Sequence, residues 1–315
     1  MNYLEKIITN DGTISFYNKA IGDIYHSQVG AYTEALKKFI KPSKIIEDLD
    51  NYSNINVLDV CFGLGYNSKV LLTEIIKKDP EKKIKLVGVE IDPNIILKSI
   101  EINFDHYPEH LKNFFDSFLH KVYYKTISDR YSYNENFSST LNNITFELFI
   151  GDAREIIKHL YGSFDIIMHD PFSPVKLPEL WTVDLFKHIY RLTDNRGRFL
   201  TYSASNAVRG GLLEAGYCLG NTEPVGRKGP GTFACKDPSL IDSNLTEYQK
   251  LLINTTAGIP FRDPLLNLSS LEIITSRELE QSNSNRISAS RIRVKDNQLK
   301  NINPQSYLTN DTKNI

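Results

Sequence analysis

The chain has 315 residues, of which 41% are hydrophobic, and this is enough for one large domain with appendages or for two domains. Its formal net charge of −1 excludes recruitment of nucleic acid by an overall positive field, so any RNA contact has to come from local basic patches. No apolar run approaches the ~20 residues that cross a bilayer, and the N-terminus has no signal-peptide core, so we expect no membrane partner.

Residues 1–50 are predicted to form a small cap ahead of the main sheet. Two short strand-like runs, Leu4–Thr9 and Thr13–Tyr17, flank an Asn-Asp-Gly tripeptide, which is a typical hairpin turn. The stretch Tyr25–Ile40 then reads as a loop entering a helix.

The organising stretch of the chain is a strand that runs into a glycine turn and then a helix. The apolar run Val57–Val60 predicts a buried parallel strand, Gly63 and Gly65 follow it, and a helical pattern covers Asn67–Lys78. Glycine lets a backbone approach a ligand closely, and the free N–H groups of a helix start face that ligand. An ordinary tight turn in any α/β domain is the alternative.

The next predicted strand, Lys85–Glu90, ends in an acid, and a carboxylate at this strand tip can accept the ribose hydroxyls of a nucleoside. Ser68 stands where the dinucleotide fingerprint has its third glycine, and the GxxxxGK[ST] phosphate loop is absent. A ligand without a pyrophosphate, such as S-adenosylmethionine, therefore fits better than NAD or ATP.

Strands and helices continue to alternate after a helix at 93–103 and an insertion at 104–143, which we expect to be an aromatic- and polar-rich loop. Alternation predicts a mostly parallel sheet of seven strands, and the short link between the last two strands requires an antiparallel member. The remaining predicted elements are strand Ile144–Ile150, helix Ala153–Leu160, strand Phe164–His169, helix Thr182–Leu192, strand Arg198–Ser203, helix Asn206–Ala215, and strands Tyr217–Thr222 and Gly231–Cys235.

Asp152 follows the third predicted strand in a Gly-Asp-Ala sequence. In a nucleoside site an acid at this strand tip can accept the adenine amino group, whereas the alternative is an ordinary helix N-cap. With Gly63, Gly65 and Glu90 in register, we expect the adenine contact. The neighbouring residues Asn67, Ile91 and Ala153 complete the predicted cofactor site.

The stretch FDIIMHDPFSPVKLPELW delivers Asp170 to the same edge of the sheet on a loop that three prolines stiffen. A rigid acidic, aromatic loop suits a cationic or amine substrate, and a carboxylate can orient an amine and take up its proton. The alternative for Asp170 is an acid that caps a turn before proline. Phe172 and Trp181 either stack on a base or pack the loop, and Pro174 and Lys176 are further substrate candidates.

Residues 237–315 differ from the rest, with prolines between short helical pieces at Leu245–Ile253 and Ser269–Glu280 and a polar, arginine-rich tail. We expect an accessory region whose last ~20 residues are flexible. The tail basic residues either grip RNA or form a solvated tail.

The order of the motifs resembles the methyltransferase module of the MnmC family of tRNA wobble-uridine enzymes. The motifs are FGxGxN, an acid after the second strand, GDA, DPFSPxKxPELW, VRGGLxEAGY and GRKG. The resemblance covers roughly residues 25–235. It implies a class I, Rossmann-like α/β methyltransferase fold, S-adenosyl-L-methionine as cofactor, and methylation of the 5-aminomethyl group of a wobble uridine in the tRNA anticodon stem-loop. It also implies these roles: Asp170 as catalytic acid–base group, Gly63 and Gly65 as cofactor glycines, Glu90 as ribose acid, and Asp152 as adenine-side acid.

Two departures from the family pattern stand in the glycine turn. Cys61 replaces a usual glycine and Leu64 a usual threonine, so the cradle is expected to be slightly tighter. The flavin oxidase half of the family is not expected, because the stretch after Cys235 is too short for it; we predict no FAD. Arg227 and Lys228 lie in a glycine-rich loop that suits phosphate contact, with a plain surface turn as the alternative.

Two other functions remain open from the sequence. An aminopropyltransferase of the spermidine-synthase type has a similar hairpin, glycine loop and Asp-Pro loop, although Lys176, Arg227 and Lys228 would repel a polyamine. A non-catalytic RNA-binding module could keep the same fold. The three widely spaced cysteines, without a CxxC pair, indicate a reduced cytoplasmic protein without a disulfide framework or metal site.

Overall fold

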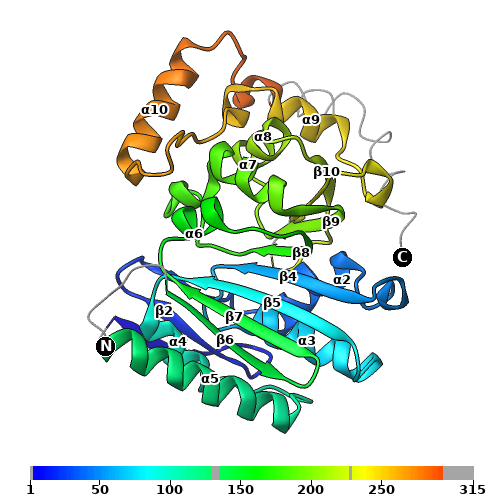
Figure 1. Cartoon of the computed structure of the whole chain (residues 1–315). Coiled ribbons are helices and arrows are strands. Elements are labelled where there is room, and N and C mark those ends of the chain that lie inside the picture. The colour runs from blue at the N-terminus through cyan, green and yellow to red at the C-terminus, as the bar shows by residue number, and fades with distance from the viewer. Residues whose placement is uncertain (1–2, 129–134, 227–228, 294–315) are drawn as a thin grey trace.

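The computed structural model describes residues 3–128, 135–226 and 229–293, and an eight-stranded sheet forms its centre (Figure 1). The five central strands are parallel to one another, and each of the three outer pairings, β10 with β11, β11 with β9 and β6 with β7, is antiparallel. In spatial order the strands are β10 (Cys218–Asn221), β11 (Thr232–Cys235), β9 (Thr193–Thr201), β8 (Phe164–His169), β4 (Asn54–Val60), β5 (Lys83–Glu90), β7 (Ile144–Ile150) and β6 (Glu135–Leu141). The predicted fold class is confirmed, but the expected count of seven strands is wrong by one.

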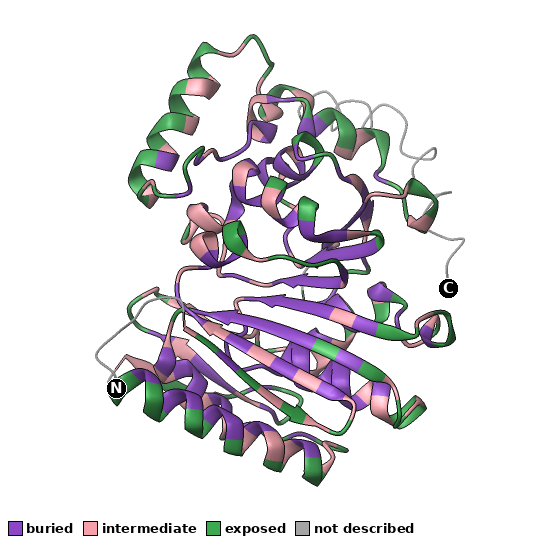
Figure 2. Cartoon of the chain, viewed as in Figure 1, coloured by how far each residue is buried: buried purple, intermediate pink, exposed green. Residues whose placement is uncertain are grey.

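Helices cover both faces of this sheet, as the alternation of its side chains requires. In β5, for example, Leu86 packs into the core on one face and Val87 into the core on the other. One face carries α3 (Tyr66–Lys78), α4 (Pro93–Ser99) and α5 (Glu109–Ser128), and the other carries α6 (Ala153–His159), α7 (Val183–Leu192) and α8 (Asn206–Glu214). Figure 2 shows the buried residues running along the central strands.

The eighth strand comes from the segment at 104–143 that the sequence predicts to be a loop. In the structure this segment supplies the 20-residue helix α5 and the edge strand β6. Two of its aromatic side chains pack in the core: the rings of Phe115 and Phe118 lie 5.2 and 5.0 Å from the ring of Phe146 in β7. Residues 129–134 of the same segment lie outside the described residues.

The N-terminal region is built on the hairpin that the sequence predicts. Strands β1 (Leu4–Ile8) and β2 (Ile14–Asn18) pair antiparallel around Gly12, which has φ +79°, and β3 (Asp23–Ile24) adds a short third strand. A continuous helical run follows: α1 (Ala31–Glu34), a π-helical stretch η1 (Ala35–Ile40), and α2 (Lys41–Ser43), with the 3₁₀ turn η2 (Leu49–Asn51) behind it. Phe16 and Phe39 belong to the same core as the main sheet, while the division into domains at residues 50 and 236 stays a prediction.

Residues after β11 pack across the α7 and α8 face. The elements are η4 (Pro238–Leu240), α9 (Glu247–Ile253), η5 (Thr256–Gly258) and α10 (Ser270–Asn283), and α10 starts with a capping box of Ser269 and Glu272. The Phe261 carbonyl accepts the N–H of Val183 at 2.9 Å, which ties this region to the start of α7. None of the helices in the described part of the chain is long and apolar enough to cross a membrane.

Candidate functional site

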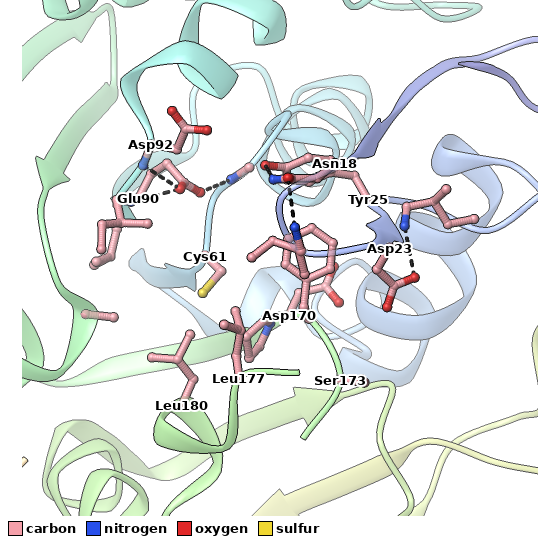
Figure 3. Close-up of a pocket in the computed structure, with 18 of the residues that line it drawn as sticks. Asn18, Asp23, Tyr25, Cys61, Glu90, Asp92, Asp170, Ser173, Leu177 and Leu180 are labelled. Atoms are coloured by element: carbon pink, nitrogen blue, oxygen red, sulfur yellow. Dashed lines mark hydrogen bonds between the residues drawn. The ribbon is translucent and has the colours of Figure 1, made fainter. Parts of the chain in front are cut away.

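A cavity of about 720 Å³ opens at the carboxyl ends of β4, β5, β7 and β8 (Figure 3). This is the edge where open α/β sheets bind ligands, because the loops after successive parallel strands meet there. The structure brings together Gly63 after β4, Glu90 at the end of β5, Asp152 after β7 and Asp170 after β8, all in the wall of this one cavity. Ile91 and Ala153 also line it.

The two glycines of the turn have different tasks. Gly63 lines the cavity with φ +55°, and its N–H donates to Glu90 Oε2 at 2.8 Å. Gly65 does not line the cavity. It begins α3 with φ +75°, and an added Cβ would lie 2.4 Å from the Phe62 ring. Backbone conformation and the packed ring both require a glycine at this position, and the cofactor contact of Gly65 stays a prediction.

The Glu90 carboxylate is held by three backbone N–H groups. Besides Gly63, the amides of Ile91 and Asp92 donate to Oε1 at 2.8 and 2.9 Å. Burial raises the pKa of Glu90 to about 7, against the lowering effect of these donors. The carboxylate has about four lone-pair positions, so roughly one remains on Oε2 for a ligand hydroxyl.

Asp152 both caps a helix and lines the cavity. Its Oδ1 accepts the N–H of Arg154 at 2.8 Å, as an N-cap of α6 does, and the Arg154 guanidinium contacts both carboxylate oxygens. The side chain of Asp152 stays 32% exposed. The capping alternative from the sequence is thus present, and it leaves the carboxylate at the cavity wall.

Asp170 sits at the end of β8 with its position fixed by two contacts. Its N–H donates to the Val60 carbonyl at 3.2 Å, and Asn67 Nδ2 donates to its Oδ2 at 2.9 Å. Burial raises the pKa of Asp170 to about 6, with His26 and Asn67 limiting the rise. Asn67 itself is buried and is not part of the cavity wall; its side chain contacts Asp170, and its cofactor contact stays a prediction.

The loop after Asp170 divides into a cavity wall and a buried anchor. Phe172 lines the cavity, and its ring meets the Tyr25 ring at 4.9 Å in an edge-on arrangement. Trp181 is fully buried, donates its indole N–H to the Phe172 carbonyl at 2.8 Å, and packs on His169. Of the two alternatives that the sequence leaves open for Trp181, the structure shows the packing of the loop.

The remaining predicted substrate residues lie at or beyond the rim. Pro174 is half-buried and Lys176 is exposed, and neither lines the cavity. Lys176 Nζ reaches the Gly22 carbonyl at 3.5 Å, which links the loop to the N-terminal region. Arg227 and Lys228 lie outside the described residues.

Sequence reasoning missed the N-terminal half of the cavity wall. Glu34 and Lys38, one helical turn apart, form an ion pair at the wall near Tyr202, and Glu34 also accepts the Ser27 N–H at 3.1 Å. His26 lies 3.8 Å from Glu34. The Glu–Lys spacing of four residues was the available signal, but nothing in the sequence placed it beside Asp170.

Cys61 stands in the cavity wall with φ +67°, a conformation that glycine adopts without strain and other residues adopt at a cost. Burial among the neighbouring carboxylates raises the pKa of its thiol well above the usual range, so it stays protonated. The departure from glycine that the sequence shows here is therefore a backbone cost as well as an added side chain.

We expect the Cys61→Gly variant to be more stable than Cys61→Ala by about 1 kcal/mol, because both lose the thiol but only alanine keeps the left-handed strain. This order of stabilities is the reverse of the one inside helices and strands, where an alanine variant is more stable than a glycine variant by roughly 0.5–1 kcal/mol. Chemical denaturation of the two variants measures the difference. Equal stabilities, or a more stable alanine variant, would show that residue 61 carries no strain.

The residues present fit an S-adenosyl-L-methionine-sized cation. The cavity wall carries far more acids than bases, and the Gly63 turn opens onto it without a side chain. The acids are Asp23, Glu34, Glu90, Asp92, Asp152, Asp170 and Glu179, against the bases Lys38 and Arg154. The described residues hold no group of three or more His, Cys, Asp or Glu side chains arranged for a metal ion.

Comparison with known proteins places this geometry in a family. Residues 115–237 match the family described as S-adenosyl-L-methionine-dependent methyltransferase. An uncharacterized protein of Methanocaldococcus jannaschii is 31% identical over 274 residues, which cover 86% of this chain and 70% of that protein. The crystal structure of MnmC2 from Aquifex aeolicus superposes with a TM-score of 0.71 at 29% identity, covering 89% of this chain and 86% of that one.

A bifunctional relative is longer than this chain. The tRNA 5-methylaminomethyl-2-thiouridine biosynthesis bifunctional protein MnmC of Campylobacter hominis is 27% identical over 212 residues. The match covers 65% of this chain but only 29% of that protein. This chain therefore spans less than a third of the bifunctional relative.

Proposed function

This chain belongs to the S-adenosyl-L-methionine-dependent methyltransferases of the MnmC type, and we propose that it methylates the amine of a 5-aminomethyl group on a wobble uridine of tRNA. The product would be 5-methylaminomethyluridine or its 2-thio form. The tRNA would be bound at its anticodon stem-loop, in the cytoplasm. The names of the relatives support this substrate, and the cavity supports an amine acceptor.

The observation that carries the proposal is the position of Asp170 in a cavity that it shares with Glu90. In the view of Figure 3, the Cys61 side chain is drawn between these two carboxylates. One carboxylate can therefore serve the cofactor and the other the acceptor, inside a single chamber walled by Tyr25 and Phe172. Bound S-adenosyl-L-methionine would supply an electrophilic methyl group.

Asp170 has the chemistry to prepare an amine for methylation. An unperturbed alkylamine resembles lysine, with a pKa of about 10.4, so it arrives mostly as an ammonium ion. The ionised Asp170 carboxylate can accept a hydrogen bond from this ammonium and take up the proton that nitrogen must lose. Asn67 holds Oδ2 in place, which leaves Oδ1 for the amine. Correct placement of the nitrogen would supply much of the rate.

Glu34 and Lys38 place a fixed pair of opposite charges in the cavity wall beside Asp170, where we expect the methyl acceptor. Lys38 is largely buried, donates to Glu34, and lies 5.9 Å from the Tyr202 ring. An ammonium has three donors, so Lys38 can also donate to a carbonyl oxygen of a pyrimidine base. A base with a carbonyl beside its aminomethyl group, as in a 5-substituted uracil, suits this arrangement.

The test is transfer from labelled S-adenosyl-L-methionine to tRNA that carries 5-aminomethyluridine, followed by nucleoside mass spectrometry. We expect the label in 5-methylaminomethyluridine, and none in the matched transcript without modified nucleosides. In parallel, putrescine with decarboxylated S-adenosylmethionine tests the aminopropyltransferase alternative. Spermidine formation, or no product in either assay, would overturn the proposed function.

A further inference from the structure

The C-terminal region reaches the wall of the cofactor cavity through one arginine. Arg154 lines the cavity, and its guanidinium lies between two carboxylates. Nη2 donates to Asp152 Oδ2 at 2.8 Å on one side. On the other side Nη1 donates to Asp263 Oδ2 at 2.9 Å and to the Leu268 carbonyl at 2.8 Å. A planar guanidinium that is bound on both sides has little freedom to turn.

Asp263 is itself held by hydrogen bonds of both its side chain and its backbone. Its side chain is 0% exposed, and its Oδ1 accepts the N–H groups of Asn267 and Leu268 at 2.9 and 3.0 Å. Its own N–H donates to Asp184 Oδ2 at 2.7 Å, at the start of α7. Oδ1 must therefore stay an acceptor, and Oδ2 is the oxygen that meets Arg154.

We propose that Asp263 is a positioning residue for the cofactor: it holds Arg154, and Arg154 holds the Asp152 carboxylate where it meets the adenine amino group. This role rests on the proposed function and on the adenine contact that the sequence predicts for Asp152. The family match ends at residue 237, so Asp263 lies outside it. The C-terminal region would then support the cofactor site, in addition to packing on α7 and α8.

A second contact supports the same coupling. Ser270, at the start of α10, donates to Glu179 Oε2 at 2.8 Å, and Glu179 also lines the cavity. The C-terminal region thus meets the cavity wall at two places, the start of α6 after β7 and the 3₁₀ turn η3 (Pro178–Trp181) after β8. Both contacts join residues about 100 positions apart in sequence.

Asp263→Asn tests the role with almost no change of shape. Because Oδ1 must accept two N–H groups, the amide would turn its NH₂ toward Arg154, and two donors would face each other. We expect the Kd of S-adenosylhomocysteine to rise about tenfold, or about 1.4 kcal/mol. The preference for S-adenosylhomocysteine over S-inosylhomocysteine, which lacks the adenine amino group, should fall by a similar factor.

Arg262→Gln is the matched control. Arg262 is the neighbour of Asp263 and pairs with Glu214 and Glu280, away from the cavity wall. It should lower the stability of the C-terminal region and leave the adenine preference unchanged. Arg154→Lys keeps a positive charge beside Asp263 but cannot bind both carboxylates through a planar fork, so it should lose the preference even if Asp263→Asn fails to fold.

Calorimetric titration of the folded variants with both nucleosides separates the outcomes without tRNA. If Asp152→Ala loses the preference for adenine while Asp263→Asn or Arg154→Lys keeps it, the positioning role is overturned. If Asp152→Ala keeps the wild-type preference, the predicted adenine contact of Asp152 is overturned first. Methyl transfer to tRNA stays a separate assay, so failure of the tRNA substrate leaves these titrations valid.

Discussion

Replacing Asp170 with asparagine is expected to lower the rate of methyl transfer to tRNA by a factor of about 10²–10⁴, the range that a positioned acid–base group contributes. The amide keeps the shape of the side chain, and its oxygen can still accept the Asn67 N–H that now reaches Oδ2. It cannot take up the proton of an ammonium ion. Single-turnover rates at saturating tRNA and cofactor measure the loss.

The same residue predicts a pH dependence with a defined sign. Burial raises the pKa of Asp170 to about 6, so the carboxylate becomes protonated as the pH falls through that value. The protonated acid cannot act as a base, and the wild-type rate should therefore fall below about pH 6. The residual rate of Asp170→Asn should lack this inflection.

A matched control for Asp170→Asn is Asp165→Asn, on the same strand. Asp165 accepts the Asn56 N–H at 2.8 Å near the other end of β8 and does not line the cavity. It should keep nearly full activity. Affinity for S-adenosylhomocysteine should stay within about twofold in Asp170→Asn. If Asp170→Asn keeps wild-type turnover, Asp170 is not the catalytic group.

The part of the site that could be predicted from the sequence is the part that lies at strand ends. Gly63, Glu90, Asp152 and Asp170 each follow an apolar run, and parallel strands bring such positions to one edge. This reasoning needs only the order of the strands. It cannot tell a wall residue from a buried neighbour on the same loop, and the sequence therefore leaves both alternatives open for Trp181, which is fully buried.

The N-terminal wall could not be predicted by the same route. Glu34 and Lys38 lie on a helical run that packs against the sheet through long-range contacts, and no strand end locates them. Their side chains reach the cavity beside Asp170 only because the N-terminal region shares the core of the main sheet. A pair of charges four residues apart is common on helix surfaces.

The missed strand has a similar physical explanation. The sequence of β6 is ENFSSTL. It is rich in polar residues and lacks the continuous apolar run that identifies the buried parallel strands. It is an edge strand that pairs with β7 alone, so most of its residues stay partly or fully exposed. Tertiary pairing outweighs local preference there.

Glu90→Gln is expected to raise the Kd of S-adenosylhomocysteine by about 10–100-fold. The carboxylate accepts three backbone N–H groups and keeps roughly one lone pair on Oε2 for a ribose hydroxyl. One hydrogen bond to a charged group contributes about 1.5–3 kcal/mol. In the variant, the amide oxygen can replace Oε1, but the NH₂ group would then face the Gly63 N–H, so the turn loses its acceptor as well as its charge.

The affinity of the wild type should also depend on pH, whereas that of Glu90→Gln should not. Burial raises the pKa of Glu90 to about 7, and a hydroxyl donor favours the ionised form, so binding should weaken as the pH falls below about 7. Titration calorimetry from pH 5.5 to 8.5 measures this dependence. The control is Glu147→Gln, whose carboxylate pairs with Lys85 on the neighbouring strand, and its binding free energy for S-adenosylhomocysteine should change by ~0.5 kcal/mol or less. A pH-independent wild type, together with unchanged affinity in Glu90→Gln, would mean that the ribose is held elsewhere in the cavity.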